Sequence, residues 1–340
     1  MKIGIIGAGG NTRLRHIPGF QAIDDVEVVA VCNRSTASAQ KVADEFGIPR
    51  VVERADDIIH ANDIDAICIG TWPYMHHPLT LASLNAGKHV LTEARMAMNL
   101  VEAREMLSAA QASDKVSMIV PAPFYLKFEP TILEMLSSGY FGDLLEIHVI
   151  GLGGMYNPEA PLQWRQRRDL SGNNIMSMGI LNESVRRYAG HEKSVMAHGR
   201  IFTTSRMDTE TSSMGTVDIP ESLGIICEMA SGATAVYHIS TVAHLGENSS
   251  MMFHGTKGSF RYKDGNAFIA DRGDRDWQPL EIPENKQGGW RVEQEFVEAV
   301  RDGKPVTHTS FEDGVKYMEF TEAVQISMRE DRRVELPLLT

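Results

Sequence analysis

The chain has 340 residues, and 33 Lys and Arg against 45 Asp and Glu leave a formal net charge of −12 at pH 7. This length predicts two domains, each large enough to bury its own core. The acidic balance argues against a nucleic-acid partner, which would need a basic face, and no apolar run approaches the roughly 20 residues of a membrane span. The three cysteines, Cys32, Cys68 and Cys227, are too few for a disulfide framework, so we expect a reduced, cytoplasmic protein.

Residues 1–122 alternate short apolar runs with segments of helical periodicity. The apolar runs are bounded by turn residues, as strands buried on both faces are, and span 2–7, 26–32, 64–70, 88–93 and 116–121. The segments between them space their apolar residues by three and four, as amphipathic helices do, and span 14–23, 36–47, 77–87 and 99–113. Gly47 and Gly87 suit helix C-terminal caps, and Pro78 suits a first helical turn. The alternation predicts an α/β domain with a doubly wound parallel sheet.

The pattern changes near residue 122, where we place the boundary between a first domain, 1–122, and a second, 123–340. A helix over 128–142 and a strand over 144–154 come first, and strand-like segments follow at 195–203, 223–241 and 249–272. Two helices close the chain near 289–302 and 311–329, and these can pack back on the first domain. The order predicts an α+β domain with a mostly antiparallel sheet. We expect hairpin turns at Ser231-Gly232 and Asp264-Gly265, and loops over 152–174 and 204–220.

A glycine-rich turn follows the first strand, where Gly7, Gly9 and Gly10 precede Asn11 and Thr12. Gly7 permits a tight turn, Gly9 lets the backbone approach phosphates, and the following helix offers free N–H groups. Thr12 stands where Gly or Ala is usual, and it can pack there or donate its hydroxyl to a phosphate. The alternative is an ordinary strand–helix turn, but its place at the start of an alternating domain favours dinucleotide binding.

The second strand ends in Cys32-Asn33-Arg34-Ser35. An NAD site usually has Asp or Glu here to accept from the ribose 2′-hydroxyl. The acid is missing, and Arg34 and Ser35 offer a forked cation and a hydroxyl to a 2′-phosphate. Arg34 can alternatively stack on the adenine face or point to solvent. The segment favours NADP as the cofactor, with NAD possible.

Several motifs resemble those of the Gfo/Idh/MocA oxidoreductases, a family that includes glucose–fructose oxidoreductase and inositol dehydrogenase. They are Gly7-Ala8-Gly9-Gly10 with His16 and Pro18, Thr71-Trp72-Pro73 through His76, Ala86-Gly87-Lys88-His89-Val90-Leu91, Phe128-Glu129-Pro130 and Trp164-Arg165. The resemblance covers essentially the whole chain. It implies a Rossmann domain that binds a nicotinamide cofactor, and a C-terminal domain whose large open sheet serves substrate binding and oligomerisation. It also implies cofactor contacts from Thr71, Trp72, His76, Glu93 and Ala94, and substrate contacts from Trp164 and Arg165.

Two departures mark the chain as a divergent member. The family's Glu-Lys-Pro motif corresponds here to Glu93-Ala94-Arg95, so its lysine is missing. The family's D-x-G-x-H pattern, anchored on Gly179, has Ser177 and Leu181 in place of its Asp and His. Because oxidation of an alcohol needs a base for the hydroxyl proton, other residues must have taken over or the chemistry differs.

The replacement candidates lie on neighbouring segments. We expect Tyr125 with Lys127, Glu183 and Arg95 to be the catalytic set, although each also has a structural explanation. Glu183 can be a helix-start carboxylate, Tyr125 and Lys127 can be an amphipathic contact, and His76 can merely orient its loop. Arg95 can also bind an anionic substrate group, and Asn182 can orient a substrate hydroxyl. The remaining histidines lack metal-ligand spacing, so we expect no metal.

The leading hypothesis is an oxidoreductase that transfers hydride between NADP, or NAD, and a sugar, polyol or related cyclic hydroxy compound. One alternative is a glycoside-cleaving enzyme that retains its cofactor and oxidises a sugar carbon transiently. The other is a non-catalytic regulator that senses the dinucleotide, which the loss of the family's Lys and His would allow. An exposed sheet face in the second domain would need a cover, so we expect a homodimer or homotetramer.

Overall fold

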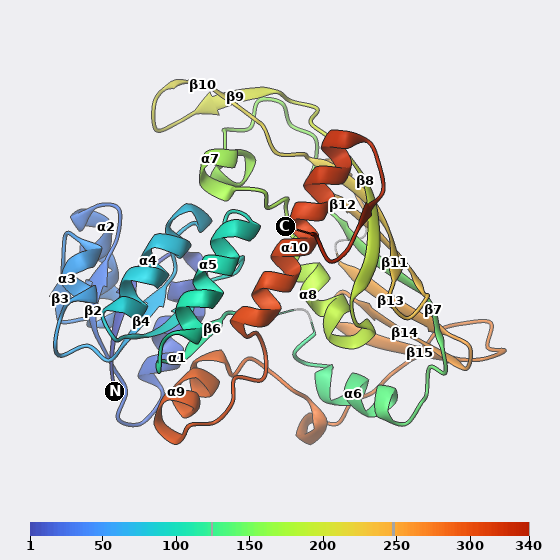
Figure 1. Cartoon of the computed structure of the whole chain (residues 1–340), viewed down its shortest axis with the longest axis horizontal. Coiled ribbons are helices and arrows are strands. Elements are labelled where there is room, and N and C mark those ends of the chain that lie inside the picture. The colour runs from blue at the N-terminus through green and yellow to red at the C-terminus, as the bar shows by residue number, and fades with distance from the viewer. Residues whose placement is uncertain (124, 247–248, 340) are drawn as a thin grey trace. The chain divides into compact units, whose positions relative to one another are not determined.

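The computed structural model describes residues 1–123, 125–246 and 249–339 (Figure 1). The chain forms two compact units. One contains Met1–Pro121 and Arg291–Met318, and the other contains Ala122–Trp290 and Glu319–Thr340. Across the described residues, every helix is too short or too polar to cross a bilayer.

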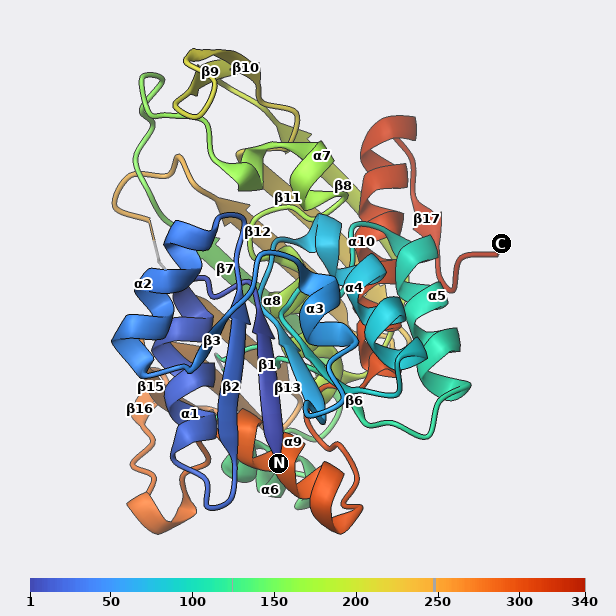
Figure 2. The same ribbon diagram turned by 90° about the vertical axis from the view of Figure 1, so that its left-hand side faces the viewer.

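The first unit contains a six-stranded parallel sheet with the order β3-β2-β1-β4-β5-β6. Its strands are β1 (Lys2–Ile6), β2 (Glu27–Cys32), β3 (Arg50–Val51), β4 (Ala66–Ile69), β5 (His89–Thr92) and β6 (Ser117–Ile119). The helices are α1 (Ile17–Gln21), α2 (Thr36–Phe46), α3 (Ala55–Ile59), α4 (Pro73–Asn85) and α5 (Leu100–Gln111). Figure 2 faces this unit and shows α2 on one side of the strands and α4 and α5 on the other. The predicted doubly wound Rossmann sheet is therefore confirmed.

Two helices of this unit differ from their predicted ranges, and β3 and α3 were not predicted. α4 begins at Pro73, so Pro78 lies inside the helix and not in its first turn. Pro73 takes the position where a missing N–H costs nothing, while Pro78 removes the N–H that would bond to the carbonyl of Tyr74. After the glycine turn, the π-helical turn η1 (Thr12–His16) precedes α1. Single π-turns in helices are frequent at functional sites, and this one lies beside the predicted nucleotide turn.

The second unit contains a nine-stranded sheet with the order β16-β15-β14-β13-β7-β12-β11-β8-β17. The strands are β7 (Leu144–Leu152), β8 (Glu192–Arg200), β11 (Ser222–Met229), β12 (Thr234–Ser240), β13 (Ser250–Gly255), β14 (Gly258–Lys263), β15 (Asn266–Asp271), β16 (Gln278–Pro279) and β17 (Val334–Glu335). The turns at Ser231-Gly232 and Asp264-Gly265 join antiparallel pairs, as predicted, whereas β12 runs parallel to β7. The mostly antiparallel sheet of the predicted α+β domain is confirmed.

The helices of the second unit are α6 (Glu129–Ser137), α7 (Arg168–Ser171) and α8 (Met178–Ala189), with 3-10 turns η2 (Trp164–Gln166) and η3 (Glu284–Lys286). The segment 204–220, predicted as a loop, contains a hairpin of β9 (Ser205–Asp208) and β10 (Ser213–Thr216). Arg206 fastens this hairpin, because its guanidinium bonds to the Glu221 carboxylate at 2.7 Å and to the carbonyl oxygen of Asn157 at 2.6 Å. The alternating burial along β9 distinguishes the hairpin from a loop.

Two long helices close the chain. α9 (Val292–Asp302) belongs to the first unit, and α10 (Phe311–Glu330) contributes residues to both units. Both lie close to the predicted ranges. The return of α9 to the first unit brings residues from late in the chain beside α1.

Candidate active site

The glycine turn after β1 is built for close backbone approach. Gly7 has a φ of +87°, and a Cβ there would lie 2.6 Å from the backbone nitrogen of Thr71. Gly9 has room for a Cβ, which would contact the carbonyl oxygen of Gly70 at 3.4 Å, and a Cβ at Gly10 would contact nothing within 4 Å. Thr12 supports the turn from behind, since its buried hydroxyl donates to the carbonyl of Gly7 at 3.3 Å. Packing is therefore what Thr12 shows in this structure, not a phosphate-facing hydroxyl.

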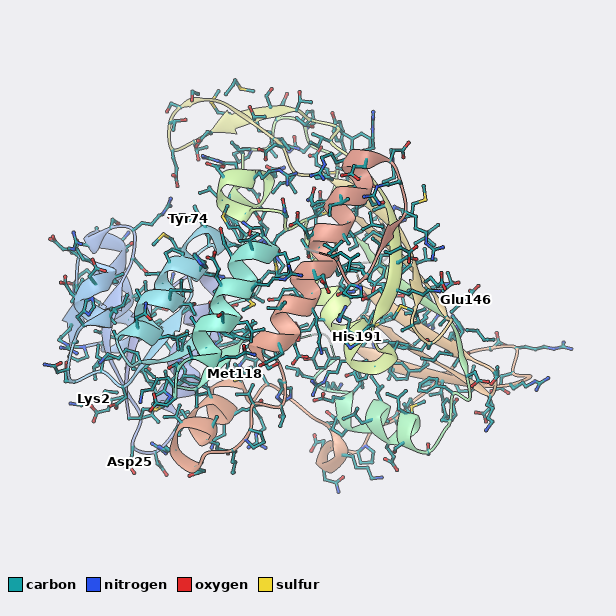
Figure 3. All side chains as sticks on the ribbon, in the orientation of Figure 1. Lys2, Asp25, Tyr74, Met118, Glu146 and His191 are labelled. Carbon is teal, nitrogen blue, oxygen red and sulfur yellow. The ribbon has the colours of Figure 1, made fainter. Side chains whose placement is uncertain are left out.

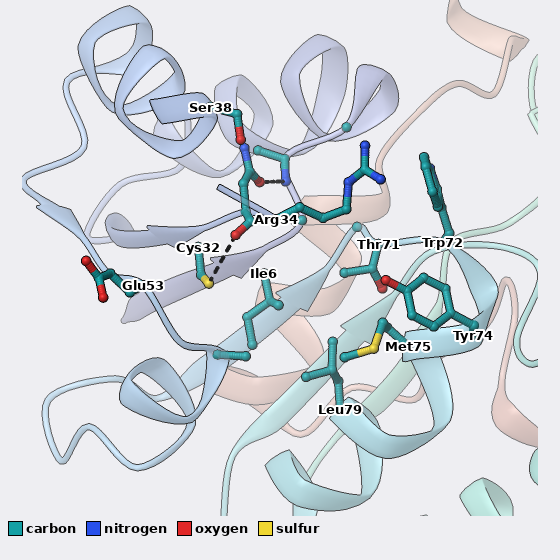
Figure 4. A pocket seen from close by; sticks show the side chains of 16 residues that line it. Ile6, Cys32, Arg34, Ser38, Glu53, Thr71, Trp72, Tyr74, Met75 and Leu79 are labelled. Atoms are coloured by element: carbon teal, nitrogen blue, oxygen red, sulfur yellow. Dashed lines mark hydrogen bonds between the residues drawn. The ribbon is translucent and has the colours of Figure 1, made fainter. Parts of the chain in front are cut away.

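A cavity of about 490 Å³ opens beside this turn (Figure 4). Its lining combines the turn with residues that follow β2, β3 and β4: Ile6, Gly7, Ala8, Gly9, Cys32, Asn33, Arg34, Ser38, Glu53, Ala55, Gly70, Thr71, Trp72, Tyr74, Met75 and Leu79. The carboxyl ends of parallel strands meet at one edge, where open α/β sheets bind their ligands. The lining thus includes the predicted residues Gly7, Gly9, Asn33, Arg34, Thr71 and Trp72.

The residues after β2 make different contacts. The Asn33 side-chain oxygen accepts the N–H of Ala8 at 2.7 Å, which holds the glycine turn. Arg34 lies over the Trp72 ring with its guanidinium carbon 4.5 Å from the ring centroid, and Figure 4 shows both side chains at the cavity. Ser35 caps α2, because its hydroxyl accepts the N–H of Ser38 at 3.3 Å. Arg34 therefore offers a stacked cation at the cavity, and Ser35 orders the start of α2.

Ten lining residues are absent from the predicted cofactor-binding set: Ile6, Ala8, Cys32, Ser38, Glu53, Ala55, Gly70, Tyr74, Met75 and Leu79. Glu53 follows a two-residue strand that leaves no readable pattern. Tyr74, labelled in Figure 3, lies in the first turn of α4. It was not predicted because this helix was expected to begin later in the sequence. The Thr71-Trp72-Pro73 motif was the one signal that could have pointed to Tyr74.

Glu93 lies after β5 in a buried charged cluster, which we call the His16 cluster: Asn11, His16, Glu93 and Glu293. The Glu93 carboxylate accepts from Asn11 Nδ2 at 2.6 Å and from His16 Nε2 at 3.0 Å. His16 Nδ1 bonds to Glu293 on α9. Burial opposes a charge on His16, but the hydrogen bonds and charges of Glu293 and Glu93 outweigh it and raise the pKa of His16 to about 9. His16 is therefore a cation at neutral pH.

The residues around Glu93 are held by backbone contacts. Ala94 N–H donates to the Glu93 carboxylate at 3.2 Å, and Arg95 is buried. The two nitrogens of buried His76 lie 3.0 Å from the Thr71 carbonyl oxygen and 2.9 Å from that of Arg95. Burial lowers the pKa of His76. His76 thus bridges the loops after β4 and β5, which supports its loop-orienting role.

Tyr125 and Glu183 form a buried pair in the second unit. The Tyr125 hydroxyl donates to the Glu183 carboxylate at 3.0 Å, and the same oxygen accepts the Ala122 N–H at 3.2 Å. Burial, followed by the charge of Glu183, raises the pKa of Tyr125 far above its usual range. Lys127 is exposed, with its ammonium 5.2 Å from the Phe128 ring centroid. Tyr125 and Lys127 therefore contact different partners in this structure, and their acid–base role stays a prediction.

The predicted substrate residues have different surroundings. Arg165 lies over the Trp164 ring, with its guanidinium carbon 4.2 Å from the centroid, in the 3-10 turn η2. Asn182 is fully buried on α8, and its amide donates to Glu192 and, at 3.3 Å, to the Tyr237 hydroxyl. Asn182 therefore serves the core instead of orienting a hydroxyl directly. Within the described ranges, no three His, Cys, Asp or Glu side chains gather as metal ligands.

Two family models match the chain. Residues 1–120 match the model described as "Oxidoreductase family, NAD-binding Rossmann fold", and residues 131–261 match the GFO/IDH/MocA C-terminal domain. The chain belongs to the Gfo/Idh/MocA family. The two matches together span more than half of it, so it is an oxidoreductase with an NAD-binding Rossmann domain, and the predicted family is confirmed.

Known proteins extend this comparison. Myo-inositol 2-dehydrogenase of Thermotoga maritima is 23% identical over 344 residues, which cover 99% of this chain and 98% of that protein. Glycosyl hydrolase family 109 protein 2 of Shewanella sp. (strain ANA-3) is 28% identical over 154 residues, which cover 43% of this chain and only 34% of that protein. The solved structure of levoglucosan dehydrogenase in complex with NADH superposes with a TM-score of 0.87 at 19% identity and covers 100% of both chains. That structure shows the same fold.

Proposed function

We propose that the protein transfers hydride between a nicotinamide cofactor, NADP in preference to NAD, and a sugar, polyol or related cyclic hydroxy compound. The observation that carries this proposal is the cavity where the Gly7–Gly9 turn, Arg34 and Trp72 meet at the carboxyl edge of the parallel sheet. The substrate class is supported by the name of the relative matched along its whole length, a myo-inositol dehydrogenase. The two units are the proposed cofactor domain and substrate domain.

The residues present fit a dinucleotide. The glycine turn has no side chain where the backbone must approach phosphates, and Asn33 holds the turn through Ala8. We assign the pyrophosphate to Gly7, Gly9, Gly10 and Asn11, with Thr12 packing behind, and the adenosine end to Asn33, Arg34, Ser35 and Trp72. Thr71 lines the cavity in the loop after β4. The contacts of His76, Glu93 and Ala94 order the loops after β4 and β5. When bound, the nicotinamide ring supplies the hydride acceptor or donor.

The preference for NADP rests on Arg34. Its guanidinium stays charged and matches a phosphate through two parallel N–H bonds, and its stacking on Trp72 pre-orients it at the cavity. Glu53 is the one carboxylate among the described residues that line the cavity. It would repel a 2′-phosphate and would suit a ribose hydroxyl. Arg34 and Glu53 are therefore the opposing determinants of cofactor choice.

Proton transfer is assigned to Glu183. Its carboxylate accepts from the Ala122 N–H and the Tyr125 hydroxyl, and these two contacts orient it. Tyr125 keeps its proton because burial and the Glu183 charge raise its pKa, so it orients the carboxylate and is not the base. Arg95 is the proposed group that polarises a carbonyl or binds an anionic substrate, and Trp164 and Arg165 are proposed to contact the sugar ring.

A second candidate is a retained-cofactor glycoside-cleaving enzyme. The match to a glycosyl hydrolase family 109 protein favours it, although that match covers about a third of that protein. Turnover of a glycoside without net change in cofactor absorbance would distinguish it. A dinucleotide-sensing regulator is the third reading, and hydride exchange with any polyol would exclude it.

Calorimetric titration of cofactor-stripped protein with NADP and with NAD is the first experiment. We expect tighter binding of NADP, a loss of about 1.5–3 kcal/mol in NADP affinity for Arg34→Ala with little change for NAD, and a gain in NADP affinity for Glu53→Gln. Equal losses of affinity for NADP and for NAD in Arg34→Ala would contradict the proposed contact between Arg34 and the 2′-phosphate. Screening sugars and polyols with the preferred cofactor, followed by absorbance of the reduced nicotinamide, then tests the reaction.

We also propose a homodimer or homotetramer that covers the large sheet of the second unit. Met196, Ile226 and Val236 lie side by side in register on β8, β11 and β12, and all three are exposed. An apolar row of this kind on an open sheet needs a cover in solution. Light scattering that shows only monomer would refute the assembly. The cytoplasmic location remains a proposal, supported by three buried cysteines that are all free thiols.

A further inference from the structure

The His16 cluster joins three separate parts of the first unit: the start of η1, the loop after β5 and α9. Asn11 directly precedes η1 and His16 ends it, Glu93 follows β5, and Glu293, on α9, lies 277 residues after His16. The side chain of His16 is completely buried, and those of Glu93 and Glu293 are 15% and 5% exposed. A residue from α9, late in the chain, therefore takes part in a cluster beside the turn near the start of the chain.

The geometry favours a charged imidazole. A neutral imidazole has one N–H and can donate to only one of the two carboxylates, whereas an imidazolium donates to both. Without that cation, two buried carboxylates would face a neutral ring beside the turn proposed to receive phosphates. The chain also leaves room for this contact, because a Cβ at Gly19 would lie 2.8 Å from a carboxylate oxygen of Glu293.

The neighbouring titratable groups do not supply this charge. The Cys68 thiol on β4 stays neutral, since burial and then the charges of Glu93 and Glu293 raise its pKa well above its usual value. His76 on α4 is fully buried, and burial lowers its pKa. Asn11 is uncharged and donates to the same Glu93 oxygen that accepts from His16. The positive charge of this cluster thus resides on His16.

We propose that Glu293 is a positioning residue for the cofactor, acting through His16 to hold Glu93 and Asn11 beside the glycine turn. The inference rests on the proposed binding of the dinucleotide at this turn. Glu293 does not line the cavity, so we infer that its effect on the cofactor passes through its hydrogen bond to His16 and through the bonds of His16 and Asn11 to Glu93. Loss of the cation would release Glu93 and leave excess negative charge near the pyrophosphate position.

The test compares Glu293→Gln with Glu298→Gln, a control on the same helix whose carboxylate bonds to Gln294 and Lys304 at the surface. The first readout is the imidazole titration of His16 by NMR in cofactor-free protein. The second is the calorimetric affinity for NADP between pH 6 and pH 10. In the wild type, we expect the affinity to stay level through neutral pH and to fall as His16 loses its proton near pH 9.

In Glu293→Gln, we expect the His16 midpoint to fall by about two pH units and the dissociation constant at pH 8 to rise about tenfold. At pH 6 the loss should be much smaller, and Glu298→Gln should behave as the wild type. A variant that is merely less stable would not move the pH at which affinity falls. Unchanged affinity at pH 8, despite a lowered His16 midpoint, would overturn the inference.

The proposed function and this inference fail differently. If the wild type binds neither NADP nor NAD, the proposed cofactor site is wrong. If the wild type binds but its affinity is level through pH 10 while His16 titrates, only the positioning role is wrong. The wild-type profile also decides the case if Glu293→Gln does not fold.

Discussion

Replacement of Gly9 by Ala should strongly weaken cofactor binding and leave the fold intact. The added Cβ would lie 3.4 Å from the carbonyl oxygen of Gly70, an ordinary contact, and Gly9 does not have a positive φ. The methyl group would instead occupy the face of the turn that we propose receives the pyrophosphate. Gly7→Ala is the contrasting variant, because Gly7 has a φ of +87° and a Cβ there would lie 2.6 Å from two atoms of Thr71.

The expected magnitudes follow from these contacts. For Gly9→Ala, we expect the free energy of unfolding to change by less than about 1 kcal/mol, since a Gly→Ala change without strain also stiffens the unfolded chain. Loss of a hydrogen bond to a charged phosphate should cost about 1.5–3 kcal/mol, or about 10- to 150-fold in the dissociation constant. Gly7→Ala should cost at least about 2 kcal/mol of folding stability from backbone strain and overpacking.

Urea unfolding and calorimetric titration with NADP and NAD measure the two effects separately. Gly9→Ala should unfold with the wild-type midpoint and bind neither cofactor well, whereas Gly7→Ala should unfold earlier. Wild-type affinity in Gly9→Ala would show that no phosphate approaches this turn. Equal destabilisation of both variants would show that the turn has no room for a Cβ at Gly9.

Three further outcomes are expected. Because the folded pKa of His16 is raised to about 9, its stabilising contribution should be complete below pH 6.5 and lost as pH rises through 9. Urea unfolding should show this loss as about 3 kcal/mol in the free energy of unfolding. An identical loss in Glu293→Gln would contradict this contribution of His16. Glu183→Gln keeps an oxygen for the Ala122 N–H, so it should fold and bind cofactor normally while turnover falls at least about 100-fold; retained turnover would remove Glu183 from proton transfer. Arg206→Met leaves the buried Glu221 carboxylate without its cation and should cost about 3–5 kcal/mol. Limited proteolysis should then cut the β9–β10 hairpin first, and resistance equal to the wild type would show that other contacts hold it.

Local patterns predicted the first unit well. Short apolar runs between helical segments can be satisfied only by a parallel sheet with helices on both faces, so the Rossmann domain followed from periodicity and turn residues. The start of α4 was missed because both Pro73 and Pro78 suit a first turn, and only packing decides between them. The β9–β10 hairpin was missed because its four-residue strands are too short and polar for a readable alternation.

The candidate site divides in the same way. Gly7, Gly9 and Arg34 were predicted because each lies next to the end of a strand, and strand ends of a parallel sheet converge. Trp72 was implied by the family resemblance alone. Side-chain direction was not predictable, as Tyr125 and Lys127 show. They are two residues apart in sequence, but one donates to Glu183 in the core and the other lies exposed over the Phe128 ring.

The sequence by itself determined the fold class and the place of the proposed cofactor turn, because these depend on local periodicity and on glycines whose role is backbone conformation. The family was identified from motifs that resemble those of its members. Only the tertiary structure decided which charges meet. Glu293 reaches His16 because α9 returns to the first unit, and Glu53 reaches the cavity because β3 lies beside β2. Such contacts depend on how segments pack in space, and an ionisable side chain has the same letter in the sequence whether its partner is water or a buried opposite charge.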